Sequence, residues 1–204
     1  MSLALCIVAF FLTLYLSRKS LVWGIASAIA FGYFYGILRA NLNETMSHFI
    51  FDTALIGLYV GRIVAVRSDT LVNTKRVQPW LIVLIAWPVF MTLLPIQDPF
   101  IQLVGLRGSV LFLPMLLLGV QMDSEQRNRL ALSIAVLNLV VFAFALAEFW
   151  YGIQDFYPRN EVTESLYRTR TDAMGQSYRI PATFTGSAVY AGTMVATLPL
   201  IIGS

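Results

Sequence analysis

Residues 130–151 read LALSIAVLNLVVFAFALAEFWY, an apolar run in which Glu148 is the one charged residue. A helix of roughly 17–25 apolar residues crosses the hydrocarbon core of a bilayer. Because lipid offers no partner to backbone N–H and C=O groups, such a run must satisfy them itself, and its continuous rather than alternating pattern favours a helix over a β-barrel strand. This stretch therefore predicts a transmembrane helix.

The same signal recurs along the rest of the chain. Of its 204 residues, 58% are hydrophobic and 12% are charged, whereas a soluble domain carries about 25% charged residues. Apolar segments alternate with polar stretches, at about 3–16, 21–38, 49–66, 80–95, 103–122, 130–151 and 180–202. We expect one all-α integral-membrane domain over residues 1–204, a polytopic transmembrane helix bundle of about seven spans in a lipid bilayer. Segment 3–16 is short for a full span.

The connections between these segments differ in charge. Basic residues concentrate in the first, third and fifth connections, which hold Arg18, Lys19, Arg67, Lys75, Arg76, Arg127 and Arg129. The second and fourth hold only Arg39 and Arg107. Since short cytoplasmic loops carry the excess of Lys and Arg, we expect the odd connections in the cytoplasm. The N-terminus and the long polar loop at 153–179 are then external.

Several function classes lack their signatures. The basic residues are scattered, so we expect no nucleic-acid partner despite the net charge of +3. The sequence has no P-loop, no dinucleotide fingerprint and no nucleophile elbow. Cys6 is the single cysteine and His48 the single histidine, so neither a disulfide within the chain nor a zinc site is expected. We expect no metal and no cofactor, and the catalytic residues stay unknown.

The last apolar segment begins with YRIPATFT, and Arg179 stands at its mouth. Proline suits the first turn of a helix, where its missing N–H costs nothing. We therefore expect a helix that starts at about residue 180, with Thr183 and Thr185 in its first turn. Free N–H groups at this N-terminus and the Arg179 guanidinium would form a cradle for an anion such as a lipid-linked phosphate. The alternative is an arginine that reaches the lipid headgroups or pairs with a loop carboxylate.

Three other charged residues lie near the predicted outer face. Arg107 lies inside a span, where charge is costly and usually faces a polar cavity. It is either an anion contact or half of an ion pair, with Glu148 as the expected partner. Glu148 has a second interpretation, as a proton acceptor. Asp52 lies near the outer mouth of the third segment, and the predicted orientation allows all of these residues to converge with Arg179 on one external vestibule.

Residues 103–200 resemble the O-antigen ligase/polymerase family of bacterial envelope proteins. The matching stretches are GLRGSVLFLPMLLLG, the charged turn DSEQRN, FAFALAEFWYGIQ and YRIPATFTGSAVYAGTMVATLPLI. The last is similar to the family's Arg–x–x–x–Thr–Phe signature. The resemblance implies glycan transfer from an undecaprenyl-diphosphate carrier at the periplasmic face of the bacterial inner membrane, without nucleotide or metal. The acceptor would be lipid A–core or a second lipid-linked glycan, in lipopolysaccharide or exopolysaccharide synthesis.

By this resemblance, Arg179 matches the signature arginine and would contact the diphosphate, and Arg107 matches an earlier family arginine. Glu148, Asp52, Thr183 and Thr185 are the residues that we expect to support this site. Family members are about twice as long and carry a catalytic histidine in a large later loop, to which His48 has no matching position.

We therefore expect the N-terminal part of a longer ligase or polymerase, which would be an enzyme only with its missing half, or an inactive version. Two other functions stay open: a small-anion transporter, similar to inorganic-carbon transporters, and a non-catalytic membrane scaffold.

Overall fold

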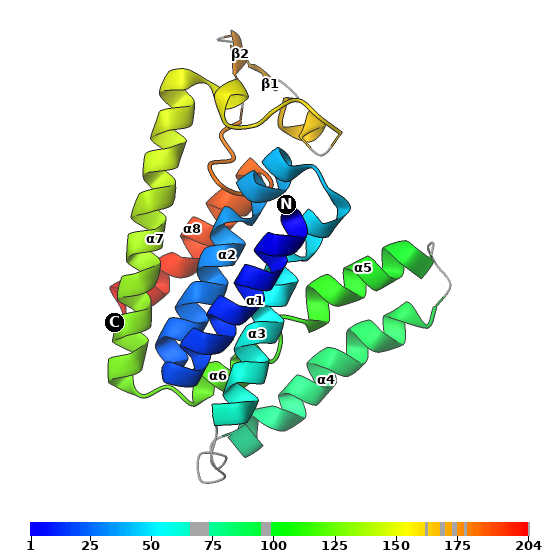
Figure 1. The fold of residues 1–204 in the computed structure, drawn as a ribbon, viewed down its shortest axis with the longest axis vertical. Coiled ribbons are helices and arrows are strands. Elements are labelled where there is room, and N and C mark those ends of the chain that lie inside the picture. Colours follow the sequence, from blue (N-terminus) through cyan, green and yellow to red (C-terminus); the bar gives the residue numbers. More distant parts are fainter. Residues whose placement is uncertain are drawn as a thin grey trace.

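The computed structural model describes residues 1–65, 74–94, 99–161, 163–167, 170–172, 175–177 and 179–203. Its centre is made of α1 (Ser2–Lys19), α2 (Leu21–Leu42) and α3 (Ile50–Ala65), and α3 is preceded by the short 3₁₀ helix η1 (Thr45–Phe49). α7 (Ser124–Tyr151) packs on α2, and α8 (Ser187–Ile202) packs on α7 (Figure 1). On the side of α3, α4 (Thr74–Thr92) and α5 (Pro99–Val110) diverge from the bundle, and α6 (Met115–Val120) leads back to it.

The helices define two ends of the bundle. We call the end where α2 and α7 finish and α3 begins the loop end, and the end where α1 finishes and α2, α4 and α7 begin the basic end (Figure 1). The segment after α7 covers the loop end with two 3₁₀ helices, η3 (Ile153–Asp155) and η4 (Glu164–Tyr167), and with strands β1 (Arg170–Asp172) and β2 (Gly175–Ser177). The strands pair antiparallel, with Arg170 opposite Ser177. The prediction of a helical protein is confirmed, and the predicted polar loop contains this small hairpin.

Local sequence explains where α7 begins and ends. At its start, the Asp123 carboxylate accepts a hydrogen bond from the Gln126 N–H at 2.7 Å, and the Gln126 side chain accepts one from the Asp123 N–H at 3.4 Å. This reciprocal pair satisfies two donors that a helix N-terminus otherwise leaves free. At its end, Gly152 has a φ of 93°, which a side chain would strongly disfavour.

Small residues let α1 and α3 approach closely. A side chain at Gly57 would clash with the Phe10 carbonyl, and one at Gly61 would clash with Ser17. The buried hydroxyls of Thr13 and Ser17 donate to carbonyls of their own helix, at 2.5 Å to Ala9 O and 3.0 Å to Leu14 O. Close contact of small residues is the usual way in which membrane helices associate. The short segment 3–16 thus forms part of an 18-residue helix that packs closely on α3 along one face.

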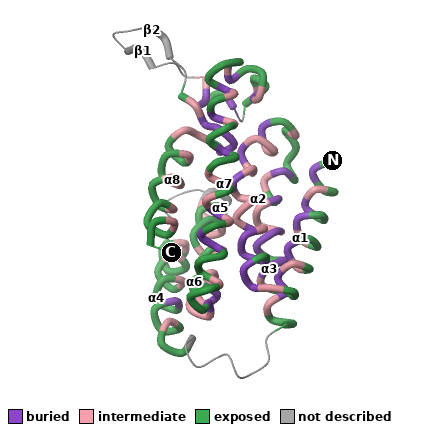
Figure 2. The backbone as a smooth tube through the Cα atoms, turned by 90° about the vertical axis from the view of Figure 1, so that its left-hand side faces the viewer, coloured by how far each residue is buried: buried purple, intermediate pink, exposed green. Residues whose placement is uncertain are grey.

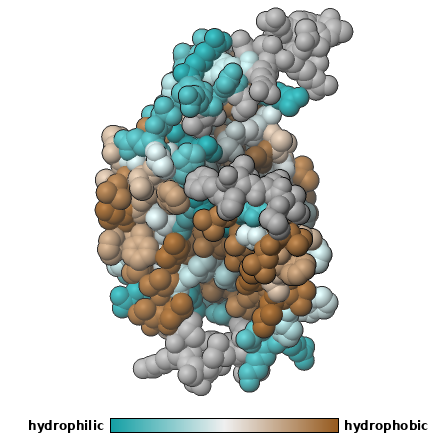
Figure 3. All heavy atoms as spheres, turned by 90° about the vertical axis from the view of Figure 1, so that its right-hand side faces the viewer, coloured by the Kyte–Doolittle hydropathy of each residue, from teal (hydrophilic) through white to brown (hydrophobic). Residues whose placement is uncertain are grey.

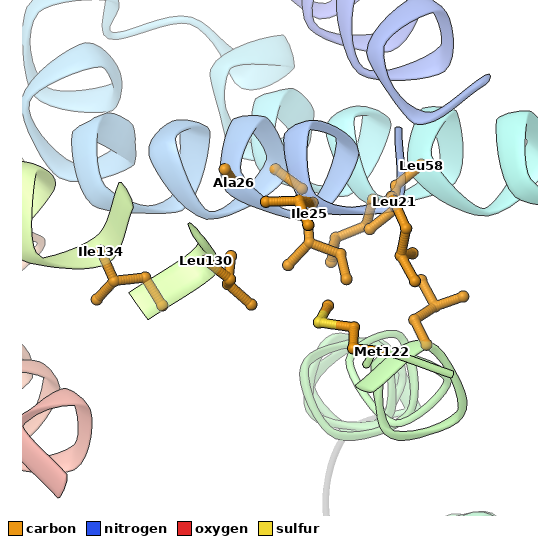
Figure 4. Close-up of a cluster of buried hydrophobic side chains, with 11 residues drawn as sticks. Leu21, Ile25, Ala26, Leu58, Met122, Leu130 and Ile134 are labelled. Atoms are coloured by element: carbon orange, nitrogen blue, oxygen red, sulfur yellow. The ribbon is translucent and has the colours of Figure 1, made fainter. Parts of the chain in front are cut away.

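An apolar core joins the basic-end halves of α2, α3 and α7 (Figure 4). Leu21 and Ile25 of α2 contribute to it together with Leu58 of α3. Met122, between α6 and α7, and Ile134 of α7 complete its opposite side. Because these residues come from distant parts of the chain, the cluster fixes the order of the central helices.

Five helices in the described ranges are long and apolar enough to cross a membrane: Ser2–Lys19, Leu21–Leu42, Thr45–Ala65, Gln102–Val120 and Ser124–Tyr151. Apolar residues also form a band across the middle of the face drawn in Figure 3, with hydrophilic residues toward both ends. The fold thus fits a multi-pass membrane protein.

Two of the seven expected segments are not among these five helices. Segment 80–95 overlaps α4 over residues 80–92, and the first turns of α4 carry Lys75, Arg76 and Gln78, which lower its mean hydropathy. Segment 180–202 contains α8, which is shorter and starts at Ser187. Segment 103–122 does qualify, although its helix is interrupted at 111–114, just before α6. α4 and α8 also bury few of their residues (Figure 2).

Candidate functional site

The signature segment 179–186 is a buried turn rather than the first turn of a helix. The backbone of Ala182 has a φ of 52°, and the Phe184 N–H donates to the Pro181 carbonyl at 3.1 Å. Residues 181–184 are all buried, and α8 begins only after Gly186. The expected anion cradle at a helix N-terminus is therefore wrong, because the N–H groups of Ala182 and Phe184 already have protein partners.

Thr183 ties this segment to α2 at two points. Its hydroxyl donates to the Tyr33 carbonyl at 2.6 Å, and its own carbonyl accepts from the Ile37 N–H at 3.0 Å. Tyr33 and Ile37 are four residues apart, so their C=O and N–H groups are the pair that an α-helix normally joins by one backbone hydrogen bond. Thr183 forms a hydrogen bond with each of these two groups. The Thr183 hydroxyl is completely buried and engaged there, so it is not free for a ligand.

Gly36 allows the segment to lie directly on α2. A Cβ at this position would collide with the backbone of Phe184 and with the amide nitrogen of Thr185. The sequence interpretation missed this contact, since a glycine inside an apolar helix has many possible reasons. The spacing of Tyr33, Gly36 and Ile37 on one helical face is the signal that would have found it.

Glu148 and Tyr157 hold the other side of the segment. Glu148 is 3% exposed, and its Oε2 accepts from the Ala182 N–H at 3.0 Å. The Tyr157 hydroxyl lies 2.7 Å from the Ala182 carbonyl and 3.0 Å from the Phe184 carbonyl, to which it donates. Burial raises the pKa of Tyr157 above its ordinary value, and the nearby Glu148 raises it further, so Tyr157 remains a neutral donor.

The second oxygen of Glu148, Oε1, is buried and has no hydrogen-bond partner among the described residues. The expected ion pair between Glu148 and Arg107 is wrong. α2 packs against α7 on one side and α3 on the other, and Glu148 faces the 182–184 turn while Arg107 pairs with a residue of α3. The alternative role of Glu148 as a proton acceptor stays a prediction.

Arg107 of α5 pairs with Asp52 of α3. Arg107 Nε lies 3.2 Å from Asp52 Oδ2, and the Arg107 guanidinium lies 5.1 Å from the centre of the Phe49 ring. The Asp52 side chain is 14% exposed and that of Arg107 is 32% exposed. The pair is thus largely covered by protein, but the guanidinium keeps an accessible edge.

Two further polar groups extend this pair into a cluster. Arg39 and Arg107 both lie close enough to Tyr35 and to His48 to act on them electrostatically. The Nε of Arg39 is buried without a hydrogen-bond partner in the described part of the chain. We call the set Tyr35, Arg39, His48, Asp52 and Arg107 the loop-end cluster. It contains two permanent cations and one carboxylate, so it carries a positive excess.

Sequence reasoning missed Arg39 and His48 as members of a site. Tyr35 and Arg39 are four residues apart on α2, on the side of the helix opposite Tyr33 and Ile37. The two faces of the end of α2 therefore serve different purposes. One anchors the 181–184 turn, and the other contributes to the loop-end cluster.

The expected convergence on one vestibule is met only in part. The structure brings Arg107 and Asp52 together, and separately brings Glu148 and Thr183 to the same turn. Arg179 is exposed and makes no hydrogen bond or ion pair with the described residues, and Thr185 is exposed beside the turn. Within the same residues, no group of three or more His, Cys, Asp or Glu side chains is placed to hold a metal ion.

Comparison with protein-family models, with curated proteins and with solved structures finds no match in any of the three. The fold is that of a helical protein that fits the multi-pass membrane class, and a positively charged cluster lies at one end of its bundle.

Proposed function

We propose that this chain binds an undecaprenyl-diphosphate-linked glycan in the bacterial inner membrane and contributes to transfer of that glycan. The reaction is taken from the resemblance to the O-antigen ligase/polymerase family, with lipid A–core or a second lipid-linked glycan as acceptor. The observation that carries the proposal is the loop-end cluster, in which Arg39 and Arg107 accompany a single carboxylate. The N-terminus and residues 153–179 would then face the periplasm.

The chemistry of a diphosphate suits this cluster. A guanidinium grips phosphate oxygens with parallel N–H donors and stays charged at all relevant pH values. Asp52 and Phe49 hold Arg107 in place, while one edge of its guanidinium stays accessible. Arg107 could therefore bind a phosphate group without a rearrangement of its own side chain. A lipid-linked donor would enter from the bilayer with its diphosphate at the depth of the helix ends. Arg179, exposed at the start of the neighbouring turn, would contact the part of the donor outside the membrane.

A binding measurement tests the proposal. The purified full chain in nanodiscs is titrated with undecaprenyl diphosphate, and Arg39→Ala, Arg107→Ala and Arg179→Ala are compared with the wild type. A hydrogen bond to a charged group contributes about 1.5–3 kcal/mol, so each substitution should weaken binding roughly tenfold to a hundredfold. Arg129→Ala, at the basic end, is the matched control and should bind normally.

Unchanged affinity in both Arg39→Ala and Arg107→Ala would remove the cluster from the binding site. The transfer step needs its own readout, which is the length of the surface glycan in cells that carry Arg179→Ala in the complete gene. Normal glycan length would reject the role of Arg179. Flux of a small anion into proteoliposomes would favour the transporter instead.

A further inference from the structure

A groove of about 460 Å³ lies toward the basic end of the bundle, far along the helices from the loop-end cluster. It runs between the end of α1, the first half of α2 and the first half of α7, and its walls include Leu16, Trp23, Ala30, Leu132 and Val136. From Trp23 to Ala30 it follows about 10 Å of helix. This course along the helix suits a segment of an extended chain.

The lining of the groove is almost entirely apolar. Its two hydroxyls, Ser27 and Ser133, donate within their own helices, at 2.8 Å to the Gly24 carbonyl and 2.9 Å to the Arg129 carbonyl. Both hydroxyls in the lining are therefore already hydrogen-bonded. A polar occupant would lose its hydration there without compensation, whereas a hydrocarbon chain would not.

Two cations stand at one end of this groove. Leu16 and Trp23 both line it, and between them in the chain stand Arg18 and Lys19, the last two residues of α1 before the junction with α2. Both basic side chains are exposed, and neither forms an ion pair with a described residue, although Lys19 lies 4.5 Å from the centre of the Tyr15 ring. On α7, Arg129 is already paired with Glu125 at 2.5 Å, and Arg127 lines a different pocket, beside Phe112 and Leu116. Arg18 and Lys19 are therefore the cations that we assign to this groove.

We propose that this groove binds one acyl chain of an anionic phospholipid, whose phosphate lies against Arg18 and Lys19. An apolar channel between membrane-spanning helices is filled by hydrocarbon, and a basic patch beside it selects an anionic headgroup. Trp23 lies at the wall and is 60% exposed, so its ring would contact the chain just below the headgroup. The site is independent of the proposed glycan donor, because it lies at the opposite end of the bundle.

Fluorescence of Trp23 tests this site directly. Replacement of Trp80, Trp87 and Trp150 by Phe leaves Trp23 as the one tryptophan. This protein is reconstituted in bilayers in which either phosphatidylglycerol or phosphatidylcholine carries brominated acyl chains, which quench tryptophan on contact. We expect brominated phosphatidylglycerol to quench Trp23 more strongly. Since a cation near the membrane surface contributes about 1 kcal/mol of lipid attraction, the preference should be about fivefold for each of the two charges.

Two sets of variants separate a specific site from general surface charge. Arg18→Gln with Lys19→Gln should abolish the preference for the anionic lipid. Lys75→Gln with Arg76→Gln, which removes two neighbouring exposed cations at the basic end of α4, should leave it intact. Ala30→Phe, which fills the groove, should reduce quenching by both lipids.

Equal quenching by the two lipids would overturn the proposal, as would equal effects of the two double substitutions. Absence of Trp23 quenching by either lipid would also overturn the proposal. That result would mean that protein, such as a second copy of the chain, covers the groove.

Discussion

Ala182 is a non-glycine residue held in the left-handed region, at a φ of 52°. Such a conformation costs of order 1–3 kcal/mol and persists only where the surroundings impose it. Here the surroundings come from three elements: Glu148 of α7 binds its N–H, Tyr157 binds its carbonyl, and α2 binds the next residue, Thr183. This turn is therefore a point where α2, α7 and the loop after α7 meet.

Glu148 should matter as an acceptor more than as a charge. Glu148→Gln keeps an oxygen for the Ala182 N–H, whereas Glu148→Ala leaves a buried donor unsatisfied, which costs about 1–3 kcal/mol. We expect the alanine variant to lower the thermal unfolding midpoint and to speed hydrogen exchange of the Ala182 amide, while the glutamine variant stays near the wild type. If glutamine were as damaging as alanine, the carboxylate charge itself would be required.

At the scale of elements, helix contacts divide into tight and open ones. α1 meets α3, and α2 meets the 181–184 turn, through glycines that no side chain could replace. α8, by contrast, has no buried residues, and its Gly192 has open space around the position of a Cβ. Two hydrogen bonds in series link it to α2 through α7: the Tyr33 hydroxyl donates to Asn138 at 2.8 Å, and Asn138 donates to Thr197 of α8 at 2.9 Å.

Two glycine substitutions test this division. Gly36→Ala should destabilise the fold, because its Cβ meets the backbone of Phe184, which cannot move without breaking the bonds of the turn. Gly192→Ala should be neutral or stabilising by up to about 1 kcal/mol, since alanine is the better helix former. Thermal unfolding of the two variants in the same detergent gives the comparison. A tolerated Gly36→Ala would show that the turn does not lie directly on α2.

At the scale of the whole molecule, the chain start is fastened to the loop end. Glu44, between α2 and η1, accepts hydrogen bonds from the Ser2 hydroxyl and from the Ser2 N–H at 3.1 Å, and its carboxylate lies 3.4 Å from the Met1 ammonium. The hydrogen bonds from Ser2, and then the Met1 charge, lower the pKa of Glu44 below its ordinary value. Helix α1 is thereby tied to the connection that leads into α3.

This contact predicts a pH dependence of stability. A carboxyl whose folded pKa is lowered stabilises the fold above its unfolded pKa of about 4.3, and this contribution disappears as the pH falls through the folded value. We expect the unfolding midpoint of the wild type to drop more steeply below about pH 4 than that of Glu44→Gln. Glu161→Gln, in the loop after α7, is the control and should follow the wild type. Parallel pH profiles for all three proteins would refute the contact.

Much of the architecture follows from hydropathy alone. Five of the expected segments coincide with helices long enough to cross a membrane, because the backbone of a long apolar run has no other way to satisfy its hydrogen bonds in lipid. The capping pair of Asp123 and Gln126 and the glycine at 152 are likewise local signals, and they set the bounds of α7.

The sequence by itself determined that this protein is a bundle of apolar helices with charges gathered toward their ends. Only the tertiary structure decided how those charges pair. Arg107 meets Asp52 rather than Glu148, and Glu148 instead holds the turn at Ala182. The physical reason is that hydropathy depends on neighbours along one helix. An ion pair, or a hydrogen bond from a side chain to a distant backbone group, depends instead on which sides of two helices are in contact. That arrangement is set by distant small residues such as Gly36 and Gly57, whose purpose appears only when the helices are packed.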